Sequence, residues 1–167
     1  MAKDQMDAVE LLKSQHREVE KLFKQIEDAE EPEDKEALFE DLADKLTVHA
    51  KIEEQFFYPA VQEKKTEDMV LEAFVEHTSI KRLLADLLEA DASDPSFDAQ
   101  IKVLKEQVEH HVEEEEGQLF PASKKVLDKE EMSAIAQEMM ALQQELEEDG
   151  DPRNDIPEEL AQQQPVT

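Results

Sequence analysis

Histidine and glutamate are the residues of this chain whose types and spacing could do metal chemistry. A histidine followed four residues later by a glutamate places both side chains on one helical face, where they can share a metal ion. That spacing alone selects little, because the chain has 45 Asp and Glu residues and four of its five histidines meet it. There are no cysteines, so thiolate sites and disulfides are excluded and any metal must be held by nitrogen and oxygen.

The helical face that each histidine occupies is more informative than the spacing. In four long amphipathic patterns, one histidine lies on the apolar stripe that should face the core. In the second and fourth patterns a glutamate follows it on the same stripe. The residues on these stripes are His16, His49, Glu53, His77, His111 and Glu115. His110 lies about 100° away from its stripe and should be exposed.

Four long helices must position these side chains. Glycine is nearly absent, at 2 residues, and Ala, Glu, Lys, Leu and Gln dominate, which favours an almost wholly helical chain. The patterns predict helices over 4–29, 34–64, 67–90 and 95–127. We expect an all-α, up-down-up-down four-helix bundle over residues 1–128. A short accessory C-terminal helix over 129–148 and a disordered acidic tail over 149–167 should follow.

The first helix pair and the second are related as copies of one unit. Aligning the chain on its histidines pairs His16 with His77, His49 with His111, and Glu53 with Glu115. The same alignment places Phe57-Tyr58-Pro59 over Leu119-Phe120-Pro121. An antiparallel helix pair that is repeated once is a natural route to an up-down-up-down bundle.

Two inward carboxylates at bundle depth need a compensating positive charge. A single histidine on an apolar stripe is usually an ordinary core residue, but an unpaired buried carboxylate costs several kcal/mol or takes up a proton. No arginine lies inward, and Lys81 is the one cation nearby. We therefore predict a pair of metal ions with open positions for water or a small substrate. By the repeat, one ion takes His16 and His49, the other takes His77 and His111, and Glu53 and Glu115 bridge both.

This constellation resembles the hemerythrin-like, or HHE cation-binding, family over about residues 5–125. The matching residues are His16, His49-x-x-x-Glu53, His77 and His111-x-x-x-Glu115, followed by the two proline-bearing tails. The resemblance implies a four-helix bundle around two iron ions with an oxo or hydroxo bridge. Manganese or zinc would accept the same ligands. It also implies small oxygen species as partners, including dioxygen and peroxide, and nitric oxide for some members.

The chain departs from the oxygen-carrying members of that family at two places. They have a second histidine four residues after that of the third helix, where this chain has Lys81, and an aspartate five residues after the last-helix histidine, where this chain offers Glu115 at four. Four histidines leave a more open and more symmetric centre. The resemblance therefore favours binding of and reaction with dioxygen or hydrogen peroxide, including a catalase-like activity in oxidative stress, over simple oxygen transport.

Three residues close to the predicted ligands have two interpretations each. Glu20 could add a carboxylate ligand, although an exposed position on an acidic helix is favoured. Lys81 could donate a hydrogen bond to a bound oxygen species, although a surface lysine is favoured. Tyr58, the one tyrosine of the chain, could approach the metals as a hydrogen-bond donor or redox partner, although a packing role is favoured.

The net charge of −27 argues against nucleic acid and anionic membrane surfaces as partners. No apolar run approaches the ~20 residues of a membrane span, and the first residues, MAKDQMDAVE, lack a signal-peptide core. We expect a cytoplasmic protein that is a monomer or a weak homo-oligomer.

Two other classes of function stay open. A non-enzymatic iron or oxygen sensor, carrier or iron-buffering protein would need a contact surface, which the fifth helix and the acidic tail could offer. A metal-free acidic bundle predicts that His49→Ala and Glu53→Ala are harmless or stabilising. Metal content together with an optical spectrum separates these classes.

Overall fold

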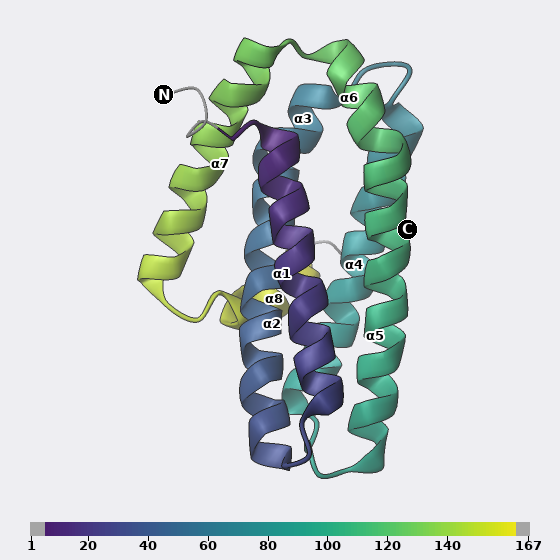
Figure 1. Cartoon of the computed structure of the whole chain (residues 1–167), viewed down its shortest axis with the longest axis vertical. Coiled ribbons are helices and arrows are strands. Elements are labelled where there is room, and N and C mark those ends of the chain that lie inside the picture. Colours follow the sequence, from purple (N-terminus) through teal and green to yellow (C-terminus); the bar gives the residue numbers. More distant parts are fainter. Residues whose placement is uncertain (1–5, 163–167) are drawn as a thin grey trace.

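A computed structural model describes residues 6–162 of the chain (Figure 1). The start predicted for the first helix, residue 4, lies outside these residues. The α-helices are α1 (Ala8–Asp28), α2 (Pro32–Ile52), α3 (Tyr58–Val61), α4 (Glu67–Glu89), α5 (Pro95–Glu114), α6 (Phe120–Val126), α7 (Lys129–Asp149) and α8 (Ile156–Gln162). Two π-helical turns, η2 (Glu53–Phe57) and η3 (Glu115–Leu119), and one 3-10 turn, η4 (Pro152–Asp155), join some of them.

Helices α1, α2, α4 and α5 form an up-down-up-down four-helix bundle, which confirms the predicted fold (Figure 1). Local signals set the helix starts. The Asp7 side chain accepts a hydrogen bond from the backbone N–H of Glu10, and that of Asp94 accepts one from the N–H of Ser96. Such side-chain caps satisfy backbone donors that have no partner within the helix. Short connections after α1 and α4 make α1 pack on α2 and α4 on α5.

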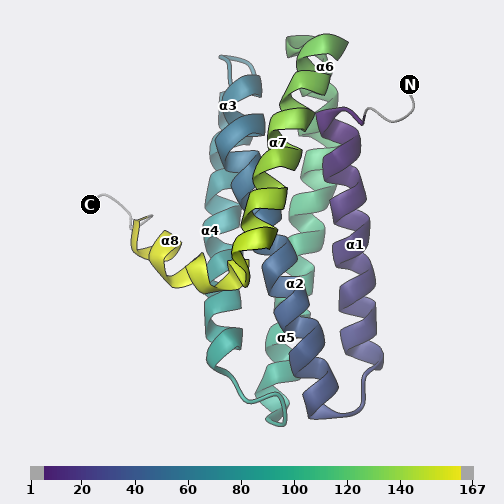
Figure 2. The same ribbon diagram turned by 90° about the vertical axis from the view of Figure 1, so that its left-hand side faces the viewer.

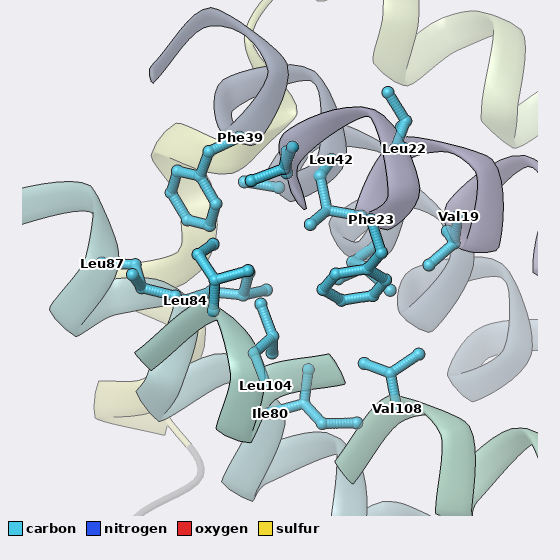
Figure 3. Close-up of a cluster of buried hydrophobic side chains, with 14 of the residues drawn as sticks. Val19, Leu22, Phe23, Phe39, Leu42, Ile80, Leu84, Leu87, Leu104 and Val108 are labelled. Atoms are coloured by element: carbon cyan, nitrogen blue, oxygen red, sulfur yellow. The ribbon is translucent and has the colours of Figure 1, made fainter. Parts of the chain in front are cut away.

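The apolar core is divided into two clusters along the bundle. The cluster in the half where α1 ends and α5 begins contains, among others, Val19, Phe23, Leu42, Leu84 and Leu104 (Figure 3). The cluster in the other half contains Leu12, Ile52, Val70, Leu119 and Met139. In each bundle helix the stripe histidine lies in sequence between residues of the two clusters. The predicted ligands therefore form a polar layer between two apolar ones.

The second and fourth bundle helices are interrupted by π turns that the sequence patterns do not predict. Each turn begins at a stripe glutamate, Glu53 or Glu115, and a proline follows six residues later, Pro59 or Pro121. The backbone N–H of Tyr58 bonds to the carbonyl of Glu53, five residues back. The prolines account for the interruption, because a proline ring clashes with the carbonyl four residues earlier and donates no hydrogen bond.

The segment after the bundle is ordered and packs back on it. Helix α7 runs along α1 and α2, and α8 lies on α4 (Figure 2). The prediction of disorder from residue 149 is wrong for residues 152–162, which form η4 and α8. Two contacts that composition does not reveal hold this segment on the bundle. Ile156 is fully buried in the first apolar cluster, and Arg153 pairs with Asp44 at 2.9 Å.

Among the described residues, no helix is long and apolar enough to cross a membrane.

Candidate metal centre

The six predicted ligands come together in one buried layer inside the bundle. Helices α1, α2, α4 and α5 each contribute one histidine, and the two π turns begin at the two glutamates. None of the six residues is more than 5% exposed. They are His16, His49, Glu53, His77, His111 and Glu115.

Glu53 lies between two histidines that are assigned to different metal ions. Its Oε1 atom is 3.1 Å from the Nε2 atom of His49 and 3.1 Å from that of His77. Two ligands about 2.1 Å from one ion and at right angles to each other are about 3 Å apart, so these distances suit shared coordination. The Nε2 atom of His49 and the Oε2 atom of Glu53 are buried and have no hydrogen-bond partner among the described residues. A buried polar atom without a partner costs free energy, and a metal ion would give both atoms a partner.

Glu115 repeats this arrangement with the other two histidines. Its Oε1 atom is 3.1 Å from the Nε2 atom of His16, and its Oε2 atom is 3.3 Å from that of His111. Ligand atoms within 4.8 Å of one another define two sets, which are His16, His49, Glu53 and Glu115, and Glu53, His77, His111 and Glu115. The sets share both glutamates, in the grouping that the sequence repeat predicts. That each residue binds metal stays a prediction.

The second ring nitrogen of each of the four predicted ligand histidines faces a side-chain oxygen. The pairs are His16 with Glu116 at 2.7 Å, His49 with Gln15 at 2.6 Å, His77 with Glu54 at 2.8 Å and His111 with Glu76 at 2.7 Å. In a neutral imidazole these acceptors favour the proton on Nδ1, which leaves the lone pair of Nε2 directed into the centre. Partners of this kind fix the ring orientation and raise the basicity of the ligand.

Sequence reasoning missed these four acceptors, although the repeat contains the signal. Glu54 and Glu116 each follow a glutamate that is predicted to bridge, and each lies within hydrogen-bond distance of a histidine of the other helix pair. Gln15 and Glu76 each precede a predicted ligand histidine. Each lies within hydrogen-bond distance of the histidine on the other helix of its own helix pair. Aligning the repeat beyond the ligands themselves would have selected these positions.

Tyr58 contacts the centre directly, so the favoured prediction of a packing role alone is wrong. Its hydroxyl oxygen is 3.1 Å from Glu53 Oε1, 2.5 Å from Glu115 Oε2 and 3.1 Å from His77 Nε2. In an α-helix, a residue five positions after Glu53 would lie about 140° away around the axis. The π turn brings the tyrosine onto the glutamate's face. Phe120, its counterpart in the repeat, stacks on His16 instead.

We expect Tyr58→Phe to destabilise the metal-free protein by about 1–3 kcal/mol, because two buried carboxylates lose their shared hydroxyl donor. The fold should be kept, since phenylalanine occupies the equivalent position 120. Urea denaturation of the two metal-free proteins measures the difference. Equal midpoints and slopes would contradict the assigned hydrogen bonds.

Lys81 is buried, so the favoured prediction of a surface lysine is wrong. It is 2% exposed, and its Nζ atom lies 3.1 Å from Glu54 Oε2 and 3.1 Å from Glu159 Oε1 of α8. The second carboxylate comes from the segment that was predicted to be disordered. Glu20 and His110 are exposed, as predicted.

The charges of this layer shift its protonation in the metal-free chain. Burial alone would raise the pKa of Glu53, but the surrounding histidines hold it well below its ordinary value of 4.5. Burial alone would lower the pKa of His111, but Glu115, Glu53 and Glu76 raise it well above its ordinary value of 6.5. The pKa values of His16 and His77 are raised in the same way. The metal-free layer therefore binds protons, which metal ions would displace.

A small cavity of about 30 Å³ adjoins the four histidines. Its remaining walls are mostly apolar and come from all four bundle helices, with Val19, Leu46, Ile80 and Val108 among them. The volume is close to the share of one water molecule in the liquid. The space therefore has room for a small molecule of about the size of water.

Imidazole and carboxylate donors that project inward from four helices define a class of metal-binding bundles. The chain belongs to the hemerythrin HHE cation binding domain family, whose model matches residues 7–123. It is thus a metal-binding, hemerythrin-like protein.

The chain is also similar to three individual proteins. It is 28% identical over 146 residues to a protein named DNA nickase from Nostoc sp., and the match covers 87% of this chain but 42% of that protein. It is 26% identical over 118 residues to an uncharacterized protein of Mycobacterium tuberculosis, covering 70% of this chain and 72% of that one. The crystal structure of an HHE domain-containing protein from Mycobacterium kansasii superposes with a TM-score of 0.76 at 26% identity, covering 95% of this chain and 94% of that one.

Proposed function

We propose that this chain is a non-haem di-iron protein that binds dioxygen or hydrogen peroxide at the buried layer and consumes peroxide. The observation that carries the proposal is the pair of donor sets that share Glu53 and Glu115. Two imidazoles and two shared carboxylates leave two positions of an octahedral ion open. The apolar cavity beside the histidines fits a molecule of the size of dioxygen or peroxide.

Iron is the ion that the proposal favours, although nitrogen and carboxylate ligands also accept manganese and zinc. When bound, a pair of iron ions supplies open positions and one-electron redox changes at each ion. The residues of the chain hold the ligand geometry: the four Nδ1 acceptors fix the rings, and two carboxylates offset positive charge. Tyr58 holds a hydroxyl proton beside both carboxylates. Burial raises its pKa well above the ordinary value of 10.0, and the two carboxylates raise it further, so that proton stays available for donation.

Metal analysis, an optical spectrum and a peroxide assay test the proposal together. Protein loaded anaerobically with ferrous iron should hold two ions per chain and, after oxidation, show the absorption bands of a bridged diferric pair. Mixed with hydrogen peroxide, it should release oxygen faster than an equal amount of free iron. One ion per chain would refute the paired centre. Two ions without oxygen release would refute the peroxide-consuming activity alone.

A non-enzymatic sensor, carrier or iron-buffering protein is the second candidate. It is favoured by the packing of α7 and α8 on the bundle helices that hold the ligands. In that case iron should change the protease sensitivity of the chain after Leu127, with no peroxide consumed. Equal cleavage with and without iron would exclude the sensor.

We also propose a cytoplasmic protein, monomeric or weakly self-associating, without nucleic-acid or membrane partners. The net charge of −27 supports this proposal, because both of those surfaces are themselves anionic. For that reason we do not extend to this chain the activity in the name of the Nostoc protein.

A further inference from the structure

A chain of side-chain amides leads from α7 to one ligand histidine. The Nε2 group of Gln143 on α7 donates to Glu147 Oε1 at 3.1 Å, and its Oε1 atom accepts from Gln15 Nε2 at 3.0 Å. The Oε1 atom of Gln15 then accepts from His49 Nδ1 at 2.6 Å. A carboxylate only accepts hydrogen bonds, so Glu147 sets the direction of the whole chain. With its amide nitrogen engaged by Gln143, Gln15 presents its carbonyl oxygen to the histidine.

A second chain, of charged groups, leads from α8 to a ligand histidine of the other metal set. The Oε1 atom of Glu159 is 3.1 Å from the Nζ atom of Lys81. The same ammonium is 3.1 Å from Glu54 Oε2, which lies 2.8 Å from His77 Nδ1. A buried ammonium needs anionic partners, and Glu159 supplies part of that charge. Glu54 can therefore be shared between the lysine and the imidazole.

All four acceptors lie on the bundle helices, but for the other two ligand histidines the acceptor's own neighbours lie there too: Arg17 contacts Glu116, and His110 contacts Glu76. Glu116 serves His16, and Glu76 serves His111. Helices α7 and α8 both lie beyond residue 123, where the family match ends. In each metal set, one histidine is thus oriented from inside the bundle and one through the C-terminal segment.

We infer that Gln143 and Glu159 are positioning residues of the metal centre, acting through Gln15 on His49 and through Lys81 and Glu54 on His77. Figure 2 shows the two helices that carry them, α7 across α2 and α8 beside α4. The C-terminal segment is then part of the site and not an appendage of the domain. This inference rests on the proposed two-metal centre.

Cobalt(II) binding tests the amide chain without relying on oxygen chemistry. Gln143→Leu should lower the affinity for one of the two ions about tenfold, the lower end of what outer partners contribute. Gln143→Glu keeps an acceptor for Gln15 and should restore the affinity. Gln144→Leu is the matched control, because Gln144 is exposed and donates a hydrogen bond to Glu148 on the same helix.

The charged chain is tested in the same assay. Glu159→Gln should lower the affinity for the ion held by His77 about tenfold, because Lys81 then draws Glu54 away from the ring. Glu158→Gln is the control, since Glu158 is the exposed neighbour. In the cobalt-loaded protein, the exchangeable and paramagnetically shifted ring N–H resonance of His77 should move in Glu159→Gln, and that of His49 in Gln143→Leu.

Specific outcomes decide the inference. Two ions bound with unchanged affinities and unchanged N–H resonances in both variants would overturn it while leaving the two-metal centre intact. A lower thermal stability with unchanged N–H resonances would show a purely structural role and would also overturn it. If the unaltered chain binds no cobalt(II), the proposed centre and the inference fall together.

Discussion

Glu115→Ala should cost the chain both of its metal ions, although it removes a single side chain. Each donor set contains Glu115, and its two oxygens lie within 3.3 Å of histidines from the two sets. Without it, each ion keeps three protein ligands, and the layer loses one negative charge. We expect the affinity for both ions to fall by more than the roughly 100-fold that outer partners can contribute. Elemental analysis after dialysis should then give close to zero ions per chain.

Two comparisons make this prediction specific to the bridge. Glu113→Ala, an exposed glutamate on the same helix, should leave both ions bound. His111→Ala removes a ligand of one set and should leave one ion, whereas His110→Ala, next to it and exposed, should leave two. A Glu115→Ala protein that keeps one tightly bound ion would show that the carboxylate does not bridge.

The apolar stripes were sufficient to predict the bundle and to select the residues that meet in its buried layer. Periodicity identifies the inward face of a helix, and it correctly predicts that His111 is buried while His110 is exposed. It works here because α1, α2, α4 and α5 stay regular up to the ligands. Periodicity cannot distinguish iron from other metals, since the same donors accept several metals.

Tyr58 makes a contact that α-helical periodicity does not predict. Its contact with Glu53 depends on a turn of five residues, and an α-helical count places the two on different faces. The prolines six residues after each glutamate carried the signal, because they disfavour a continuous α-helix there. The repeat alone could not supply the hydroxyl, since the equivalent position is Phe120.

Lys81 shows a second limit, which is tertiary. It follows His77 by one turn, on the side that the stripe would bury, but a lysine in that position is normally assigned to the surface. It is buried because it pairs with Glu159 of α8. This helix lies in a segment whose composition is typical of a disordered chain. Composition averages over a segment and cannot register that Ile156 is fully buried there.

Removing the metal should reverse the way in which stability depends on pH above neutrality. In the metal-free chain the folded state raises the pKa values of His16, His77 and His111 above 6.5. Their stabilising contribution is complete below about pH 6.5 and is lost as the pH rises through the raised values. The slope is about 1.4 kcal/mol per pH unit for each proton that only the folded state holds. The lowered pKa values of Glu53 and Glu115 act oppositely: their contribution is present above about pH 4.5 and is lost in acid.

The metal-free protein should therefore be most stable between about pH 4.5 and 6.5 and should lose stability as the pH rises above about 6.5. Metal ions take the place of these protons, so their affinity, and the stability that they add, should rise over the same range. An ion present at 100 times its dissociation constant adds about 2.7 kcal/mol per site, so the gap between the two unfolding curves should exceed that value at pH 8. Calorimetry at pH 6 and pH 8 measures both forms. His111→Gln should flatten the metal-free slope, because Glu115, Glu53 and Glu76 raise the pKa of this buried imidazole. His110→Gln, at the exposed neighbouring position, is the control. A metal-free protein whose unfolding temperature rises from pH 6 to pH 8 would contradict the protonated layer.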